Sequence, residues 1–125
     1  MNGPFYFEIQ GDDPERAITF YRHVFDWTFT KAEGLPVDYW RIETDRGRGG
    51  LLKRPAPVPT TPSGTNAFVC SMEVGDFDAA AAKIINLGGR VALPKFAVPG
   101  VCWQGYFLDT ESNTFGIFQP DPSAK

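Results

Sequence analysis

Histidine is almost absent from this sequence: His23 is the only one among 125 residues, and Cys70 and Cys102 are the only thiols. Imidazole and thiolate are the ligands that zinc and related ions prefer, so their shortage argues against a metal centre built on them. His23 falls off the centre of the apolar stripe of a predicted helix, and we therefore expect it on the surface. Two cysteines make no disulfide framework, so we expect both to be reduced core residues.

An excess of positive charge is also missing, since the formal net charge is -3 and the isoelectric point is near 5.0. Nucleic acids demand a basic surface, so we expect no nucleic-acid partner. The one basic cluster is best explained as a solvated hairpin, with an anionic ligand at its rim as the alternative. It consists of Arg46, Arg48, Lys53 and Arg54.

Long apolar runs are absent as well, and Met1 to Pro4 leads into a predicted strand without a cationic and apolar signal segment. A membrane span needs about 20 apolar residues, so we expect no membrane partner and a cytoplasmic location. What the chain does contain is 42% hydrophobic and 14% aromatic residues. That composition and length predict one domain, 1–125, with an aromatic-rich core.

The chain repeats one pattern: Gly11-Asp12 and Gly75-Asp76 each follow an extended segment and open a predicted helix. Aspartate is a favoured N-cap, and apolar residues then recur at three- and four-residue spacing. The first half contains strands 5–10, 27–31, 37–44 and 49–53 and a helix from Pro14 to about Phe25. The second contains strands 66–74, 90–96, 101–108 and 114–119 and a helix from Phe77 to about Leu87.

Proline and glycine mark the boundaries of this pattern. The Pro-rich segment 55–65 favours an extended path, which predicts a linker between a first module, 1–54, and a second, 66–125. Gly88-Gly89 is expected to end the second helix in a left-handed conformation. The glycines of segment 46–50 predict a tight hairpin with positive φ angles, and residues 120–125 are expected to form a tail.

Two β-α-β-β-β modules with Phe20-Tyr21 late in the first helix, Leu87-Gly88-Gly89 ending the second and Asp109 to Asn113 as the last turn resemble the vicinal oxygen chelate superfamily. This superfamily contains glyoxalase I, bleomycin-resistance proteins, fosfomycin-resistance enzymes and extradiol dioxygenases. The stretch from Glu8 to Phe25 looks like small bacterial glyoxalase-like members. The resemblance implies an α+β fold in which two curved mixed sheets form a cup with the helices outside, and a homodimer. Asp109-Thr110-Glu111-Ser112-Asn113 departs from the family's Asp-Pro-x-Gly-Asn turn.

Metal-dependent members of the family place His, Gln or Glu in the cup, from the first and last strand of each half. The resemblance puts these positions on Tyr6, near Gly50, on Val69 and on Gly116. None of them carries an imidazole or a carboxylate, which divalent ions of this kind prefer. We therefore expect no metal and no other cofactor, and this places glyoxalase I, dioxygenase and thiol-transfer activities in doubt.

Glu8 is the leading catalytic candidate, with Tyr6 beside it on the same strand face. A carboxylate among aromatic residues in a partly desolvated cup is able to act as a general acid or base; the alternative is a structural hydrogen bond or ion pair. Aromatic walls bind planar or apolar molecules well, whereas core packing also explains each ring separately. The predicted ligand-binding set is Tyr6, Glu8, Gln10, Trp40, Val69, Glu73, Trp103, Tyr106, Gly116 and Phe118.

These observations predict a metal-free protein of this family that binds a small aromatic or amphipathic molecule in its cup. One alternative is a glyoxalase-like lyase or isomerase that uses Glu8 with Tyr6, or an ion site that the residues do not reveal. The other is a structural or regulatory module whose cup is filled by its own side chains.

Overall fold

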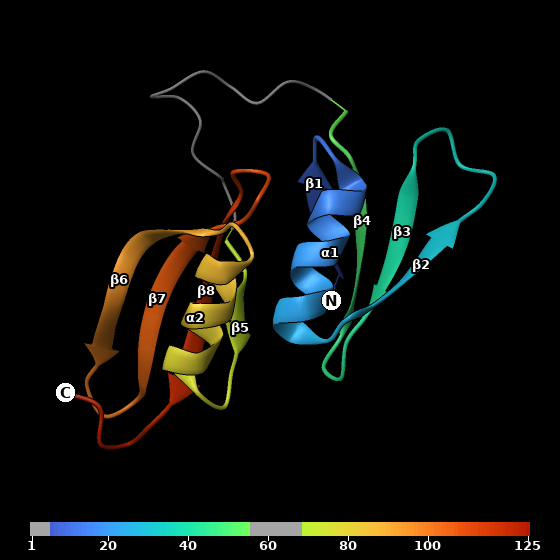
Figure 1. Ribbon diagram of the computed structural model, residues 1–125. Coiled ribbons are helices and arrows are strands. Elements are labelled where there is room, and N and C mark those ends of the chain that lie inside the picture. Colours follow the sequence, from blue (N-terminus) through green and yellow to red (C-terminus); the bar gives the residue numbers. More distant parts are fainter. Residues whose placement is uncertain (1–5, 56–68) are drawn as a thin grey trace. The chain divides into compact units, whose positions relative to one another are not determined.

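The computed structural model describes residues 6–55 and 69–125, and for Tyr6 the backbone alone. The chain divides into two compact units, residues 1–59 and 60–125. Each has the element order β-α-β-β-β and a four-stranded mixed sheet (Figure 1). The predicted α+β class and the repeated module are confirmed. Except for Pro55, the predicted linker lies outside the described residues, as do residues 66–68 of the predicted fifth strand.

The first unit consists of β1 (Tyr6–Gly11), α1 (Pro14–Phe25), β2 (Thr28–Ala32), β3 (Tyr39–Glu43) and β4 (Arg48–Lys53). Its strand order is β1-β4-β3-β2, and β1 pairs with β4 in parallel. The helix begins where the sequence predicts: Asp13 caps it by accepting a hydrogen bond from the Arg16 amide at 3.2 Å, and Pro14 occupies the first turn, where its missing N–H has no cost.

The core of this unit lies between α1 and the sheet. Ala17, Ile18, Ile42 and Leu51 are buried there, and Phe7, Ile9, Trp27, Phe29 and Trp40 pack against them. Trp27 follows the helix and stacks on Tyr21, with ring centroids 5.4 Å apart and planes 2° from parallel. His23 is exposed, and its Nδ1 lies 2.7 Å from the Thr19 carbonyl oxygen, so its predicted surface position is confirmed.

The second unit consists of β5 (Ser71–Glu73), α2 (Phe77–Asn86), β6 (Arg90–Val98), β7 (Cys102–Leu108) and β8 (Thr114–Pro120), with strand order β5-β8-β7-β6. Asp76 caps α2 by accepting a hydrogen bond from the Ala79 amide at 3.0 Å. Gly88 follows the helix with φ +97°, as predicted. Phe77 and Ile84 of α2 are buried against the sheet, and Phe77 lies 6.3 Å from Phe107 between ring centroids.

Several expectations about loops and ends are wrong. In the glycine-rich hairpin, Gly47, Gly49 and Gly50 have ordinary φ angles, and the last two lie within β4 under close contacts. Residues 120–125 are not a tail: Pro120 belongs to β8, Ala124 is 2% exposed, and its carbonyl accepts a hydrogen bond from the Gly100 amide at 2.9 Å.

One of the two cysteines is buried and the other is exposed. Cys102 is buried, as expected, whereas Cys70 is exposed. Cys70 precedes a strand that is shorter than predicted, so no sheet position carries its side chain into the core. Both are free thiols. No helix in the described part of the chain has the length and apolar character needed to cross a membrane.

Candidate ligand-binding faces

Each sheet has one face covered by its helix and one face that the helix leaves open. Residues paired across neighbouring strands point to the same side, and successive residues alternate, so the register assigns every side chain to a face. We call the uncovered side the helix-free face. On the first sheet this face carries Glu8, Gln10, Tyr39, Arg41, Glu43, Arg48, Gly50 and Leu52.

Glu8 and Tyr39 form the central polar contact of the first helix-free face. The Tyr39 hydroxyl donates a hydrogen bond to Glu8 Oε2 at 2.6 Å. Glu8 is the β1 partner of Gly50, and the Tyr39 phenol lies so close above Gly50 that a Cβ there would overlap its ring and hydroxyl. The missing side chain at Gly50 is therefore what lets Tyr39 reach across β4 to Glu8.

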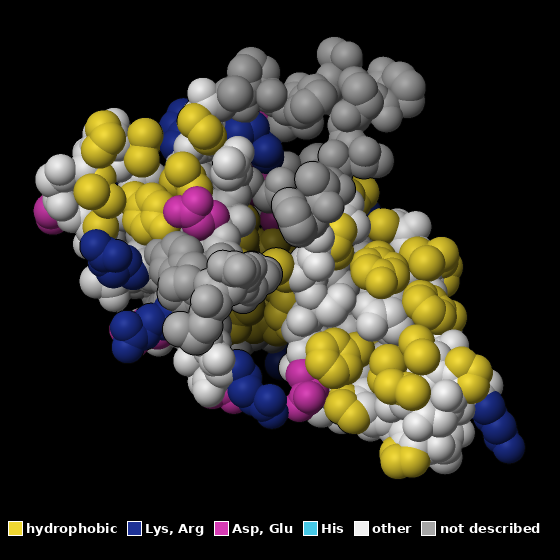
Figure 2. Space-filling view, turned by 180° about the vertical axis from the view of Figure 1, so that it is seen from behind, with side chains coloured by type: hydrophobic (Ala, Val, Ile, Leu, Met, Phe, Trp, Pro, Cys, Tyr) yellow, Lys and Arg dark blue, Asp and Glu magenta, His cyan; other side chains and the backbone are white. Residues whose placement is uncertain are grey.

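The second helix-free face is an aromatic surface. Gln104 on β7 has Phe96 and Phe118 as its cross-strand partners, and Tyr106 is the next residue of β7 on this side. Phe96 and Tyr106 stack, with ring centroids 6.4 Å apart and planes 26° from parallel. All four side chains are half-buried. Figure 2, viewed from the side opposite the helices in Figure 1, shows hydrophobic side chains gathered over this unit.

The second face repeats the arrangement of the first around Gly116. Ser71 on β5 is the partner of Gly116, and Gln104 Nε2 lies 3.3 Å from Ser71 Oγ as its hydrogen-bond donor. A Cβ at Gly116 would overlap the Ser71 hydroxyl and come within 2.8 Å of Gln104 Nε2. Ser71, Gln104 and Gly116 thus hold the positions that Glu8, Tyr39 and Gly50 hold in the first unit.

The structure places most of the predicted ligand residues either on one of the two helix-free faces or on the helix side of a sheet. Glu8 and Gln10 lie exposed on the first helix-free face, and Glu73, Tyr106, Gly116 and Phe118 lie on the second. Trp40 and Trp103 lie on the helix sides of their sheets, because Trp40 pairs with Leu51 of the core and Trp103 is one residue from Gln104. Val69 precedes β5 and is 44% exposed, so its predicted strand position is wrong. The side chain of Tyr6 lies outside what the structure describes.

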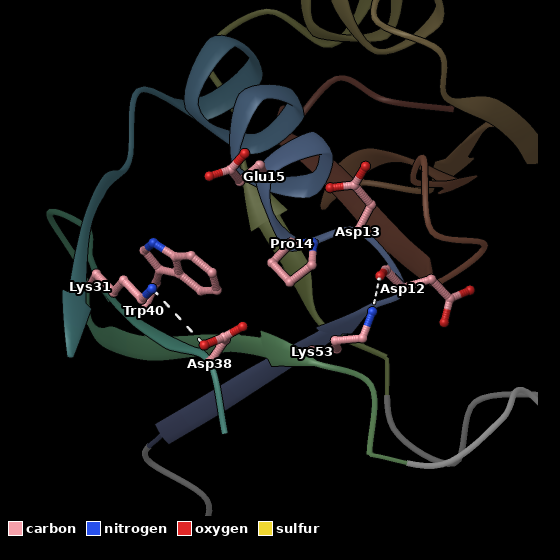
Figure 3. A pocket seen from close by; sticks show the side chains of 8 residues that line it. All are labelled: Asp12, Asp13, Pro14, Glu15, Lys31, Asp38, Trp40 and Lys53. Carbon is pink, nitrogen blue, oxygen red and sulfur yellow. Dashed lines mark hydrogen bonds and ion pairs between the residues drawn. The ribbon is translucent and has the colours of Figure 1, made fainter. Parts of the chain in front are cut away.

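Trp40 lines a cavity of about 460 Å³ between the start of α1 and the strands of the first sheet (Figure 3). Both lysines that line it contact other residues of the unit: Lys31 Nζ lies 4.0 Å from Asp38 Oδ1, and Lys53 Nζ donates to the backbone carbonyl oxygen of Asp12 at 3.0 Å. The Lys31 ammonium also lies 5.5 Å from the centroid of the Trp40 ring. Both lysines thus have contacts inside the unit, and the lining also contains the acidic residues Asp12, Asp13, Glu15 and Asp38.

Trp103 takes part in a network that fixes the end of the chain. Its indole Nε1 donates to Asp121 Oδ2 at 3.0 Å, and Lys95 Nζ lies 4.8 Å from the centre of its ring. Hydrogen bonds from the Ser123 side chain, the Ser123 amide and the Trp103 indole lower the pKa of Asp121. This network explains Trp103 as a structural residue of the second unit.

A divalent metal does not fit the residues at the positions where the resemblance implies ligands. Gly50 and Gly116 supply no donor atom, and the space above each is taken by Tyr39 or by Ser71 and Gln104. Val69 is aliphatic. Within residues 6–55 and 69–125, no group of three or more His, Cys, Asp or Glu side chains is placed to hold an ion.

Tyr39, Ser71, Phe96 and Gln104 were not among the predicted site residues. The sequence predicts Tyr39 within a strand. The face that its side chain occupies depends on the exact register with β4, and strand parity does not determine that register. Phe96 was the last residue of a predicted strand, whereas β6 continues to Val98. The glycines Gly50 and Gly116 were the available signal, because a glycine inside a strand often marks a close approach of neighbouring atoms.

The family model described as Glyoxalase/Bleomycin resistance protein/Dioxygenase superfamily matches residues 3–117. This match spans most of the chain, and the protein belongs to that superfamily. The comparison with curated proteins found no match.

Solved structures share the fold at low sequence identity. A glyoxylase/bleomycin resistance protein/dioxygenase domain from Frankia sp. EAN1pec is 14% identical with a TM-score of 0.77, over 97% of this chain and 93% of that one. The fosfomycin resistance protein FosX from Listeria monocytogenes is 11% identical with a TM-score of 0.77, over 97% and 93%. A hypothetical protein from S. aureus is 16% identical with a TM-score of 0.71, over 95% and 98%. A variant of the Listeria protein was solved with Mn(II) and a dihydroxypropylphosphonic acid.

Proposed function

We propose that this protein is a metal-free member of its superfamily that binds a small aromatic or amphipathic molecule on the helix-free face of the second sheet. The observation that carries the proposal is the set of half-buried rings Phe96, Tyr106 and Phe118 around the amide of Gln104. Aromatic rings that are half-exposed offer flat apolar surface on which a further ring is able to stack. The Gln104 amide at the centre donates from Nε2 to Ser71, and its oxygen supplies an acceptor that orients a polar substituent of the ligand.

The glycine positions support the metal-free part of the proposal. In each unit, a glycine allows a hydrogen-bonded pair of side chains to occupy the surface: Glu8 with Tyr39, and Ser71 with Gln104. These pairs offer hydrogen bonds to a ligand where a metal-dependent relative would offer an ion. The homodimer expected from the resemblance stays a prediction.

A thermal-shift screen across small aromatics, antibiotics and thiol adducts tests the proposal. A compound that binds only the folded chain at a concentration of 100 times its Kd stabilises it by about 2.7 kcal/mol, which raises Tm by several degrees. For any such compound, Tyr106→Leu is expected to weaken binding about fivefold in calorimetric titration, because stacking contributes roughly 1 kcal/mol beyond area. Trp103→Phe, on the same strand but on the opposite face, is the matched control and should leave Kd unchanged.

Two results would contradict this proposal. Equal loss of affinity in Tyr106→Leu and Trp103→Phe would place the ligand elsewhere. No rise in Tm with any compound would favour the structural or regulatory module, in which the rings serve packing alone.

The 2.6 Å hydrogen bond between Tyr39 and Glu8 favours a second candidate, a lyase or isomerase that uses Glu8 as acid or base. The phenol fixes the carboxylate through Oε2, and a carboxylate held in place is able to act as a positioned proton acceptor. On this hypothesis Glu8→Gln should lower kcat at least 100-fold while Kd for the substrate changes little. Tyr39→Phe, which keeps the ring and removes the positioning bond, should lower kcat less. Unchanged turnover in Glu8→Gln would eliminate the catalytic role.

A further inference from the structure

Arg41 differs from its charged neighbours in the residues that surround it. It lies on the helix-free face of the first sheet, exposed, with Thr30 of β2 and Gly50 of β4 as its two cross-strand partners. Neither partner carries a charge. Arg48, on the same face, is instead directly opposite Glu43, and opposite charges at such positions interact favourably.

The Arg41 guanidinium makes no hydrogen bond, ion pair or ring contact with any residue of the described segments 6–55 and 69–125. By comparison, Arg54 Nε lies 3.1 Å from Asp12 Oδ1, and Arg22 lies over the Phe29 ring. Each of those arginines has a structural contact, whereas Arg41 has none with the described residues.

Glu8 is the nearest carboxylate along the same row of the sheet, on the far side of Gly50. Two strand spacings separate the backbones at Arg41 and Glu8, about 10 Å, a distance at which charges in water interact weakly and are screened by salt. Glu8 is also engaged by the Tyr39 hydroxyl. Glu43, two residues along β3 on the same face, is opposite Arg48, and within the described residues no ion pair joins Arg41 to Glu43 or to Glu8.

We propose that Arg41 is an oxyanion-binding residue, which takes the carboxylate or phosphate group of a small molecule on the helix-free face of the first sheet. A guanidinium presents its donors in a planar fork that matches two oxygens of one oxyanion. Thr30, its cross-strand partner on β2, supplies a hydroxyl group on the same face beside the bound oxygens. This site is built from residues of the first unit alone, and its test does not depend on ligand binding to the second unit.

The test is an NMR titration of the full-length, ¹⁵N-labelled protein with sodium benzoate and, separately, sodium phosphate, at constant ionic strength kept with sodium chloride. Benzamide is the uncharged counterpart of benzoate. The Arg41 Nε–Hε signal, assigned by its loss in Arg41→Gln, is expected to shift to saturation with the oxyanion and to stay in place with benzamide. Arg41→Gln, followed at the Gly50 amide, should raise the apparent Kd about tenfold, and Arg41→Lys should raise it by a smaller factor.

Arg22→Gln is the matched control, since it removes the same charge from the helix side of the same unit. It should leave the Kd unchanged. Saturation with benzoate alone assigns a carboxylate, saturation with phosphate alone assigns a phosphate, and both together assign a general oxyanion site. Linear, equal shifts at all arginine signals, or an unchanged Kd in Arg41→Gln, mean an adventitious ion only and overturn the proposal.

Discussion

Gly49→Ala is expected to lower the free energy of unfolding by about 3 kcal/mol, at the upper end of the usual cost of overpacking. Gly49 is buried in β4, with β1 and β3 on either side. A Cβ at this position would lie 2.6 Å from the carbonyl oxygen of Phe7 and 2.6 Å from its ring atom Cζ. The ring is able to move, but the carbonyl belongs to the paired strand, so relief requires the β1–β4 pairing to open. Urea unfolding monitored by circular dichroism measures the loss.

Gly47→Ala is the matched control, two residues earlier in the same hairpin. Nothing lies within 4 Å of a Cβ at Gly47, and its φ is ordinary. The substitution should change stability by less than about 0.5 kcal/mol, or raise it slightly by restricting the unfolded chain. If both alanine variants lost the same stability, backbone freedom in the hairpin and not the contact with Phe7 would be the cause.

Asp109→Ala is expected to cost about 3 kcal/mol, because several buried donors would lose their acceptor together. Asp109 is 2% exposed. Its Oδ1 accepts from the Glu111 amide at 2.8 Å and the Asn113 amide at 2.9 Å, and Oδ2 accepts from Asn113 Nδ2 at 3.1 Å. Alanine would leave these N–H groups without that acceptor in a loop that must turn tightly between β7 and β8.

Asp109→Asn separates the shape of this side chain from its charge. The amide oxygen is still able to accept from the two backbone N–H groups, while the second bond to Asn113 is lost because two amide NH₂ groups would face each other. We expect Asp109→Asn to lose about half as much stability as Asp109→Ala in the same unfolding measurement. A loss equal to that of alanine would show that the negative charge is what the loop requires.

The repeated module was predictable because its signals are local. Asp13 and Asp76 cap helices, and Gly88 ends one, through contacts within a few residues along the chain. The prediction that residues 120–125 form a tail was wrong because long-range contacts hold this segment. Trp103 and Gly100 form hydrogen bonds with residues 121 and 124. No pattern in residues 120–125 predicts these partners.

The binding faces were predictable only in part, for a related reason. Strand parity correctly separates Glu8 from Phe7 and Ile9, because these residues alternate along one short strand. Strand parity does not say which residues of β3 pair with which residues of β4. A shift of this register by one residue moves every side chain of β3 to the other face of the sheet. Trp40 and Tyr39 are neighbours in sequence, and the register alone places Tyr39 above Gly50 and Trp40 in the core.

The overlap at Gly50 and at Gly116 makes these positions epistatic with the side chains above them. A glutamate introduced at Gly50 alone would collide with Tyr39, so a ligand for an ion gains a place there only after Tyr39 is made smaller. Making Tyr39 smaller first removes the hydrogen bond to Glu8. At Gly50 the first of the two substitutions is thus unfavourable in either order, because it displaces or removes the Tyr39 hydroxyl that bonds to Glu8.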